Sequence, residues 1–146
     1  MQIRLVYANV RGLVGKLASV KEMLSDTEAT IACLMETHLS ENKCVVIDGY
    51  TFIGRERGGK SGGGVGIFVK TAPKQNASLY YSARDIEIVW VSINRINHSP
   101  LHIGVYYGKQ ESTPQEEMRE EIDNLTEEKL EMKATGEIIL CMDGDA

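Results

Sequence analysis

Four polar residues lie where apolar stretches of the sequence end, and their side chains suit metal-ion chemistry. They are Asn9, Glu36, Asp143 and Asp145, which follow the segments 3–8, 29–35 and 138–142. A carboxylate at the end of a buried strand is costly unless it meets a cation or hydrogen-bond donors. Three carboxylates and one amide could hold a single Mg²⁺ ion, which prefers oxygen ligands. The same pattern also fits solvated acids that cap the next turn, so spacing alone leaves both interpretations open.

The elements that would position Asn9 and Glu36 are predicted to be strand, helix and strand. Residues 3–7 alternate between apolar and polar types, which predicts a strand. Apolar residues at helical spacing predict a helix over 16–26, and the continuous apolar run 29–35 predicts a strand buried on both faces. These lengths indicate a βαβ-like unit. In sheets built from such units the strand ends converge on one edge, where ligands bind.

The middle of the chain is predicted to be rich in strands. Candidate strands cover residues 51–55, 64–70, 78–82, 86–94 and 101–107. The segment 86–93 is the strongest of these because it is rich in β-branched residues. The segment 138–142 predicts a last buried strand, and no internal repeat or domain boundary interrupts the chain.

One long helix is predicted before that last strand. Thr113, with Pro114 at the first helical position and Glu116 three residues after Thr113, has the pattern of a capping box. The helix is expected to end near residue 135. Its expected apolar stripe consists of Met118, Ile122 and Leu125, with acidic residues on the other faces.

Length and composition exclude several classes of protein. With 146 residues, 42% of them hydrophobic, the chain can form one modest globular domain. No apolar run approaches the roughly 20 residues that a membrane helix needs. The three cysteines have no CxxC spacing, which argues against a disulfide framework or a zinc knuckle. With no secretory signal visible either, we expect an intracellular protein, nuclear or cytoplasmic.

The charge is uneven along the chain. The formal net charge is −5, and most of the acidic excess lies between residues 111 and 131. A uniformly basic nucleic-acid surface is therefore excluded. The sequence is still compatible with a local basic patch for nucleic acid at Arg55, Arg57 and Lys60, with Arg11 and Lys16 nearby. Such residues are also typical of ordinary solvated surface charges.

Residues 54–61 match the formula of a nucleotide-binding P-loop, but their context does not. A P-loop lies between a buried strand and a helix whose N-terminus meets the phosphates. Here Ser61 is followed by three glycines and the strand-like segment 65–69. Because three glycines cannot start a stable helix, we expect a hairpin loop and no nucleotide site.

Six short motifs resemble, in order, those of the endonuclease/exonuclease/phosphatase superfamily. They are NVRGL at 9–13, LMETHL at 34–39, GGGVGIFV at 62–69, IEIVWV at 86–91, VYYG at 105–108 and MDGDA at 142–146. The Glu-Thr-His-Leu variant at 36–39 is particularly similar to endonuclease domains of non-LTR, LINE-type retrotransposons. The motifs extend over nearly the whole chain.

The resemblance implies a fold and an activity. The implied fold is a DNase I-like, four-layered α/β sandwich, present here as one truncated domain over residues 1–146 that lacks the C-terminal strands. The implied activity is hydrolysis of a phosphodiester with Mg²⁺, or alternatively Mn²⁺, so that a retrotransposon nicks its target DNA. A divalent ion suits this reaction, because it offsets the negative charge that develops on the phosphate during hydrolysis.

The resemblance also implies a role for individual residues. Glu36 would bind the metal, and Asn9 would position a phosphate oxygen or a metal-bound water. Tyr106 would contact the scissile phosphate or the departing oxygen. Asp143 would orient or deprotonate the attacking water, and Asp145 would take the place of a phosphate-binding asparagine. Phosphate contacts along the DNA backbone are expected from Arg11, Arg55, Arg57 and Lys60.

The chain departs from the family pattern in four ways. Arg11 replaces an Asp or Asn near the metal, and Gly108 replaces a proline after the tyrosine. Asp145 replaces Asn, which puts a carboxylate where a phosphate should lie. The closing Ser-Asp-His segment is absent, and no histidine follows His102. We therefore expect the isolated chain to be weak or inactive.

Two other functions remain open at this stage. A degenerate, non-catalytic relative could persist as a binding module, and the edge exposed by truncation could then form a homodimer. A relative that acts on inositol phosphates or RNA would share the metal site and differ in its loops. Only the Glu-Thr-His-Leu likeness favours DNA over these substrates.

Overall fold

The computed structural model describes residues 3–39, 45–55, 63–71, 77–82, 84, 86–95, 97–108 and 114–142. In these ranges the chain forms two sheets, two α-helices and one short 3₁₀ helix. The elements are β1 (Leu5–Asn9), η1 (Val14–Lys16), α1 (Leu17–Thr27), β2 (Ile31–Met35), β3 (Tyr50–Arg55), β4 (Val65–Lys70), β5 (Ala77–Tyr81), β6 (Ile88–Ile93), β7 (Leu101–Tyr106), α2 (Gln115–Thr135) and β8 (Glu137–Met142).

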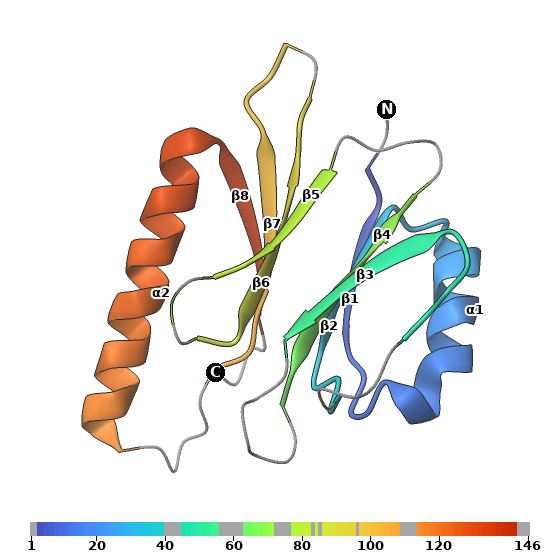
Figure 1. Cartoon of the computed structure of the whole chain (residues 1–146), viewed down its shortest axis with the longest axis horizontal. Coiled ribbons are helices and arrows are strands. Elements are labelled where there is room, and N and C mark those ends of the chain that lie inside the picture. Colours follow the sequence, from blue (N-terminus) through green and yellow to red (C-terminus); the bar gives the residue numbers. More distant parts are fainter. Residues whose placement is uncertain are drawn as a thin grey trace.

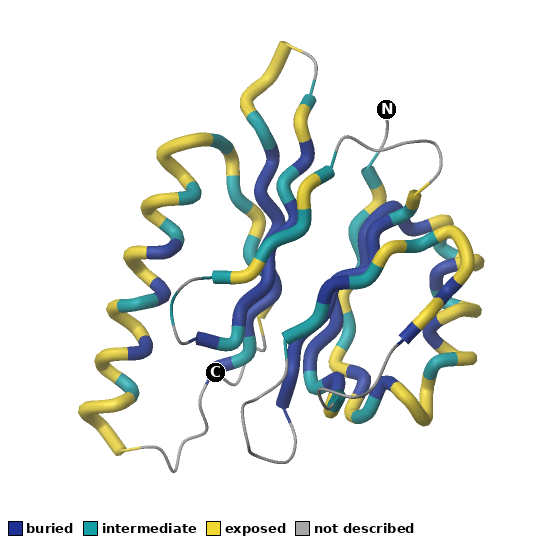
Figure 2. Tube along the Cα trace, in the orientation of Figure 1, coloured by how far each residue is buried: buried dark blue, intermediate teal, exposed yellow. Residues whose placement is uncertain are grey.

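The elements stack in four layers, with a helix outside each of two facing sheets (Figure 1). The first sheet has the strand order β1-β2-β4-β3, and the second has the order β5-β6-β7-β8. The central strands β2, β4, β6 and β7 are buried along most of their length (Figure 2). The predicted four-layered α/β architecture is confirmed.

Each sheet contains one parallel strand pair joined through a helix. β1 and β2 are parallel and connected by α1, whereas β7 and β8 are parallel and connected by α2. The other neighbouring strands are antiparallel. The predicted βαβ-like unit at the N-terminus is confirmed, and a second unit of the same kind closes the described chain.

The core between the sheets consists of small and branched apolar side chains. Cys33 and Ile67 from the first sheet pack in one cluster with Val91 and Ile103 from the second. Cys141 on β8 joins this cluster and is 7% exposed. Burial of this kind stabilises the fold by about 25 cal/mol per Å² of apolar surface.

Helix α1 packs on the outer face of the first sheet through apolar contacts. Val20 and Leu24 are its buried residues, and they pack with Leu34 on β2 and Phe68 on β4. The helix ends at Thr27, and its C-cap residue Glu28 has a left-handed backbone that lets its N–H donate to the carbonyls of the last turn. The helix observed over 17–27 agrees with the predicted range within one residue.

Helix α2 differs from its prediction, because its buried face carries two carboxylates. The buried residues are Glu121, Leu125 and Glu128, whereas Ile122, expected in the apolar stripe, is 56% exposed. The expected stripe is therefore wrong apart from Leu125 and the half-buried Met118. The carboxylates tolerate burial because donors from the second sheet and its connections reach them.

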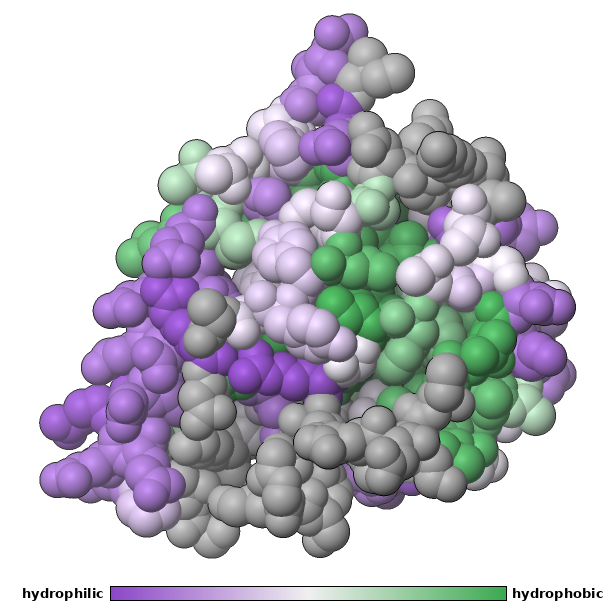
Figure 3. Space-filling view, viewed as in Figure 1, coloured by the Kyte–Doolittle hydropathy of each residue, from purple (hydrophilic) through white to green (hydrophobic). Residues whose placement is uncertain are grey.

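Three donors account for this burial. The Tyr106 hydroxyl donates to Glu121 at 2.8 Å, and the Trp90 indole N–H lies 3.4 Å from a Glu128 oxygen. Arg84 approaches the other Glu128 oxygen at 2.8 Å and also pairs with exposed Glu131. The face of α2 seen in Figure 3 is mostly hydrophilic. Neither α-helix in the described ranges is both long and apolar enough to cross a membrane.

The start of α2 also differs from the prediction. Pro114 has an extended backbone and is the N-cap residue, so the helix begins at Gln115 and not at the proline. Pro114 makes no side-chain cap, and the expected cap residue Thr113 lies outside the described residues.

The first two strands begin later than predicted. Residues 3 and 4 precede β1, and residues 29 and 30 precede β2. Both strands are therefore shorter at their N-terminal ends than predicted.

Candidate active site at the strand-end edge

Asn9 and Glu36 lie side by side where the first parallel pair of strands ends. Asn9 is the last residue of β1 and is in register with Met35, so Glu36 follows directly beside it. The Asn9 amide nitrogen donates a hydrogen bond to a Glu36 carboxylate oxygen. Two oxygen-bearing side chains, 27 positions apart in the sequence, are thus brought together at the protein surface.

The turn that presents Glu36 has an unusual backbone. Glu36 and His38 both have a φ of 54°, in the left-handed region that costs a non-glycine residue about 1–3 kcal/mol. Thr37 between them is 1% exposed. Such a backbone persists only where the surroundings hold it, and here two neighbouring segments do so.

The first of these segments follows β1. The amide of Gly12 donates to the Glu36 carbonyl at 2.8 Å, and that of Leu13 donates to the Thr37 carbonyl at 2.9 Å. Both acceptors are main-chain groups of the turn, so these bonds fix its backbone on one side. Arg11, in the same segment, is exposed and also has a positive φ, of 47°.

The second segment is the glycine pair before β4. The Thr37 amide donates to the Gly64 carbonyl at 3.2 Å, and the His38 amide donates to the Gly63 carbonyl at 2.9 Å. Gly64 has a φ of +91°, and a Cβ atom there would lie 2.5 Å from the Thr37 hydroxyl oxygen. Only glycine meets both requirements. β4 follows directly and pairs antiparallel with β3, as a hairpin requires, and no helix follows the glycines. The expected loop over 56–62 lies outside the described residues.

The second sheet reaches the same place through Glu87. The Gly64 amide donates to a Glu87 carboxylate oxygen at 2.9 Å, and the Glu87 carbonyl accepts from the Tyr107 amide at 3.0 Å. Glu87 therefore connects the glycine pair of the first sheet to the end of β7. We call the set Asn9, Glu36, Gly64, Glu87 and Tyr106 the strand-end edge.

Tyr106 lies on the α2 side of β7, whereas Tyr107 packs against the core between the sheets. The Tyr106 side chain is 4% exposed, and its hydroxyl donates to Glu121. Burial and this carboxylate raise the pKa of Tyr106 well above its ordinary value. The structure thus places Tyr106 at the strand-end edge but directs its hydroxyl toward α2.

The aspartates predicted for the site lie outside the described residues, as do Arg57 and Lys60. These aspartates are Asp143 and Asp145, which follow β8. The last residue of β8, Met142, is in register with Tyr106, so β8 ends at the strand-end edge as well. The roles assigned to these four residues remain predictions.

Arg55 makes contacts within the protein. Its guanidinium donates to the carbonyls of Ser82 and Arg84, at 3.3 and 3.1 Å. These bonds connect the end of β3 in the first sheet to the chain between β5 and β6 in the second. Arg55 therefore holds the two sheets together beside the strand-end edge, a role that its position in a basic cluster does not predict.

The donor set suits a hard divalent ion. A carboxylate and an amide oxygen are among the ligands that Mg²⁺ prefers, and Mg²⁺ commonly uses one or two carboxylates and several waters. No group of three or more His, Cys, Asp or Glu side chains with metal-site geometry occurs among the described residues. Within those residues, Glu36 and Asn9 offer one carboxylate and one amide oxygen to such an ion, and its remaining ligands would be waters or groups outside the described ranges.

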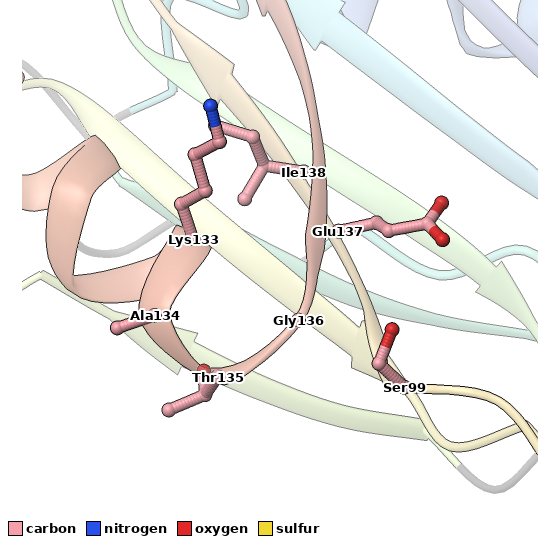
Figure 4. Close-up of a pocket in the computed structure, with 7 residues that line it drawn as sticks. All are labelled: Ser99, Lys133, Ala134, Thr135, Gly136, Glu137 and Ile138. Carbon is pink, nitrogen blue, oxygen red and sulfur yellow. The ribbon is translucent and has the colours of Figure 1, made fainter.

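A pocket of about 660 Å³ lies at the opposite end of β8 (Figure 4). It is lined by Ser99, Lys133, Ala134, Thr135, Gly136, Glu137 and Ile138. The Lys133 and Glu137 side chains extend in different directions and do not converge on one point. Because β8 begins here and ends at Met142, this pocket is separate from the strand-end edge.

Sequence reasoning missed Glu87 and Glu121 as residues of this region. Glu87 lies inside the strand predicted over 86–94, and no signal in the sequence places it beside Gly64, 23 residues earlier. Glu121 shares one helix face with Leu125 and Glu128, at spacings of four and three residues. This spacing predicts a buried helix face only if carboxylates are counted together with the apolar residues.

Comparison with known proteins shows similarity at the level of structure. No family model matches the chain, and no curated protein matches it significantly in sequence. Among solved structures, the 3′ phosphatase NExo from Neisseria, bound to a product DNA hairpin, is similar with a TM-score of 0.74 and 17% identity. The similarity covers 99% of this chain and 58% of that one.

Two further solved structures show the same similarity. The catalytic domain of Xenopus laevis APE2 has a TM-score of 0.73 and 17% identity, over 97% of this chain and 58% of that one. The endonuclease domain of TRAS1, a telomere-specific non-LTR retrotransposon, has a TM-score of 0.66 and 18% identity, over 99% and 61%. The chain thus spans less than two thirds of each, and it has the DNase I-like fold of these endonuclease/exonuclease/phosphatase structures.

Proposed function

We propose that this chain is part of a metal-dependent DNA endonuclease of a non-LTR retrotransposon, which nicks target DNA by hydrolysing a phosphodiester. The observation that carries the proposal is the contact between Asn9 and Glu36 at an edge where strands of both sheets end. The DNase I-like fold supports a phosphodiesterase, and the Glu-Thr-His-Leu sequence at 36–39 favours the retrotransposon class.

We assign a separate role to each polar residue at the strand-end edge. Glu36 would hold a Mg²⁺ or Mn²⁺ ion, which when bound offsets charge on the phosphate and favours deprotonation of a water. Asn9 orients the Glu36 carboxylate by its hydrogen bond and would direct its amide toward a phosphate oxygen or water. Tyr106 would have to exchange Glu121 for a phosphate oxygen before it could contact DNA. Asp143 would act on the attacking water.

The charge of the surface favours one approach for DNA. The acidic helix α2 carries Glu116, Glu117, Glu120 and further acids, so it would repel a phosphate backbone. Arg11 lies exposed on the turn beside Glu36. We propose that DNA approaches over the first-sheet side of the strand-end edge, with Arg11, Arg57 and Lys60 on phosphates. Arg55 would contribute by holding the sheets together.

A nicking assay tests this function. Supercoiled plasmid is incubated with an excess of the chain and Mg²⁺, since we expect only weak activity from a chain that spans 58–61% of the similar solved structures. We expect slow nicking that EDTA and Glu36→Ala abolish and that the α1 control Glu22→Ala retains. Nicking that survives Glu36→Ala or EDTA would contradict the proposal. An RNA of matched sequence tests the alternative substrate.

A second candidate function is a non-catalytic module that forms homodimers. This function is favoured by β8, which is an edge strand of the second sheet in the described residues. The β8 residues Ile139 and Met142 are each 40% exposed. An exposed strand edge with apolar side chains can pair with a second copy. Light scattering on the purified chain separates the two candidates, because a monomer over a wide concentration range argues against the dimer.

A further inference from the structure

Glu87 joins the two sheets at the strand-end edge by a charged hydrogen bond. It precedes β6 in the second sheet and is half-buried, and its carbonyl is fixed by the Tyr107 amide. Its carboxylate oxygen accepts the amide hydrogen of Gly64, in the first sheet, at 2.9 Å. Bonds in which the acceptor is ionised are about twice as strong as neutral ones.

The peptide group that Glu87 binds also holds the Glu36 turn. The amide of Gly64 and the carbonyl of Gly63 belong to one peptide unit, and that carbonyl accepts the His38 amide at 2.9 Å. The next carbonyl, of Gly64, accepts the Thr37 amide at 3.2 Å. A carboxylate on the N–H side of a peptide polarises it and strengthens the bond on its carbonyl side.

We propose that Glu87 is a positioning residue for the metal-binding turn. By fixing the orientation of the 63–64 peptide, it holds Thr37 and His38, and through them the strained backbone that sets Glu36 beside Asn9. This inference rests on the proposed function, because the purpose of a fixed Glu36 is to hold a metal ion. It adds a residue of the second sheet to a metal site formed by the first.

Glycine makes the positioning necessary. Gly63 and Gly64 have φ values of 67° and 91° and no side chains, so the peptide between them has few intrinsic restraints. A flip of this peptide would break the bonds to Glu87 and His38 together. A carboxylate on the other sheet is thus the contact that selects one orientation, since a backbone acceptor in its place would bond less strongly.

Hydrogen exchange in the metal-free chain tests this role directly. In Glu87→Ala, we expect the amides of Gly64 and His38 to exchange at least about tenfold faster, because both bonds involve the 63–64 peptide. The amide of Thr37, which donates to the next carbonyl, of Gly64, should also exchange faster. The core amides of Val91 and Ile103 should keep their protection. Glu87→Gln keeps an acceptor oxygen without the charge, so it should fall between wild type and alanine. The control is Glu137→Gln, which alters an exposed ion pair with Arg95.

Metal affinity gives the second readout. Glu87→Ala should weaken Mn²⁺ binding about tenfold, as is usual when a residue that orients a metal ligand is lost. Unchanged exchange at Thr37 and His38 would overturn the proposal, and so would equal acceleration at Val91 and Ile103. If the wild-type chain binds no Mn²⁺, the proposed function fails, while the exchange data still decide whether Glu87 holds the turn.

Discussion

The two strand–helix–strand units of the chain share one topology and treat their polar groups in opposite ways. In β1-α1-β2, the helix buries only apolar side chains, Val20 and Leu24, and the polar residues Asn9 and Glu36 lie at the exposed strand ends. In β7-α2-β8, the helix buries Glu121 and Glu128, and the strand-end tyrosine donates to the first of them.

The two units show that the same architecture can either expose or bury its polar groups. An apolar helix contact leaves the strand-end groups available to solvent and ligands. A helix with buried carboxylates takes up the strand-end hydroxyl for its own stability, because an unpaired buried carboxylate is costly. The first unit therefore provides the candidate ligands. The second sheet contributes mainly through Glu87, which precedes β6 outside the β7-α2-β8 unit, and through the packing between the sheets.

The largest expected effect is on the apolar contact of α1. Leu24 is 2% exposed, and Leu24→Ala should lower the free energy of unfolding by about 2–5 kcal/mol. Leu125→Ala in α2 should cost less, because Leu125 is 8% exposed and lies between polar contacts. Urea denaturation measures both. Leu130→Ala, at a residue 63% exposed, is the control and should change stability by less than about 0.5 kcal/mol.

The opposite order of these two effects on stability would contradict the contrast between the helices. If Leu125→Ala destabilised the chain more than Leu24→Ala, the second unit would depend more on apolar packing than the first. The contrast between the two helices would then be wrong.

The next effect concerns the glycine beside the Glu36 turn. Gly64→Ala introduces a Cβ atom at a φ of +91° and 2.5 Å from the Thr37 hydroxyl, so we expect a loss of about 1–3 kcal/mol and weaker Mn²⁺ binding. Gly15→Ala is the matched control, because no atom lies within 4 Å of a Cβ there. Equal Mn²⁺ affinities in the two variants would show that the turn does not depend on Gly64.

The smallest effect is the pH dependence of the second unit. Burial and Glu121 raise the pKa of Tyr106 above the ordinary value of 10.0. The unfolded chain therefore loses this proton first, and the stability that Tyr106 provides is complete below about pH 10 and falls as the pH rises further. Tyr106→Phe should remove that part of the alkaline slope and cost about 1–2 kcal/mol at neutral pH.

Urea denaturation across this pH range measures the slope, with Tyr7→Phe as the control, at a residue 64% exposed. An unchanged alkaline slope in Tyr106→Phe would mean that another group is responsible.

The sequence predicted what depends on local pattern. Apolar alternation and helical spacing located the strands and helices, and the strand ends predicted Asn9 and Glu36 as neighbours, because parallel strands end at a common edge. The three glycines before 65–69 likewise excluded a nucleotide-binding helix.

The missed features depend on contacts between distant segments. Glu128 can be buried because Trp90, 38 residues earlier, supplies an indole N–H. Arg55 binds carbonyls of residues 82 and 84, which become available acceptors only when the two sheets pack together. The residue pattern of one segment cannot predict a hydrogen-bond donor that a distant segment supplies. The buried carboxylates of α2 and the role of Arg55 were therefore visible only in the structure.

A Mn²⁺ titration of the chain, followed by NMR line broadening, tests directly whether Glu36 holds a metal ion at the strand-end edge. Mn²⁺ broadens the signals of nearby nuclei, and the chain offers two contrasting surfaces: the strand-end edge and the acidic helix α2. We predict that the amides of Asn9, Glu36 and Thr37 broaden first and that Glu36→Ala abolishes this broadening. Broadening that begins along α2, or that is unchanged in Glu36→Ala, would contradict the account.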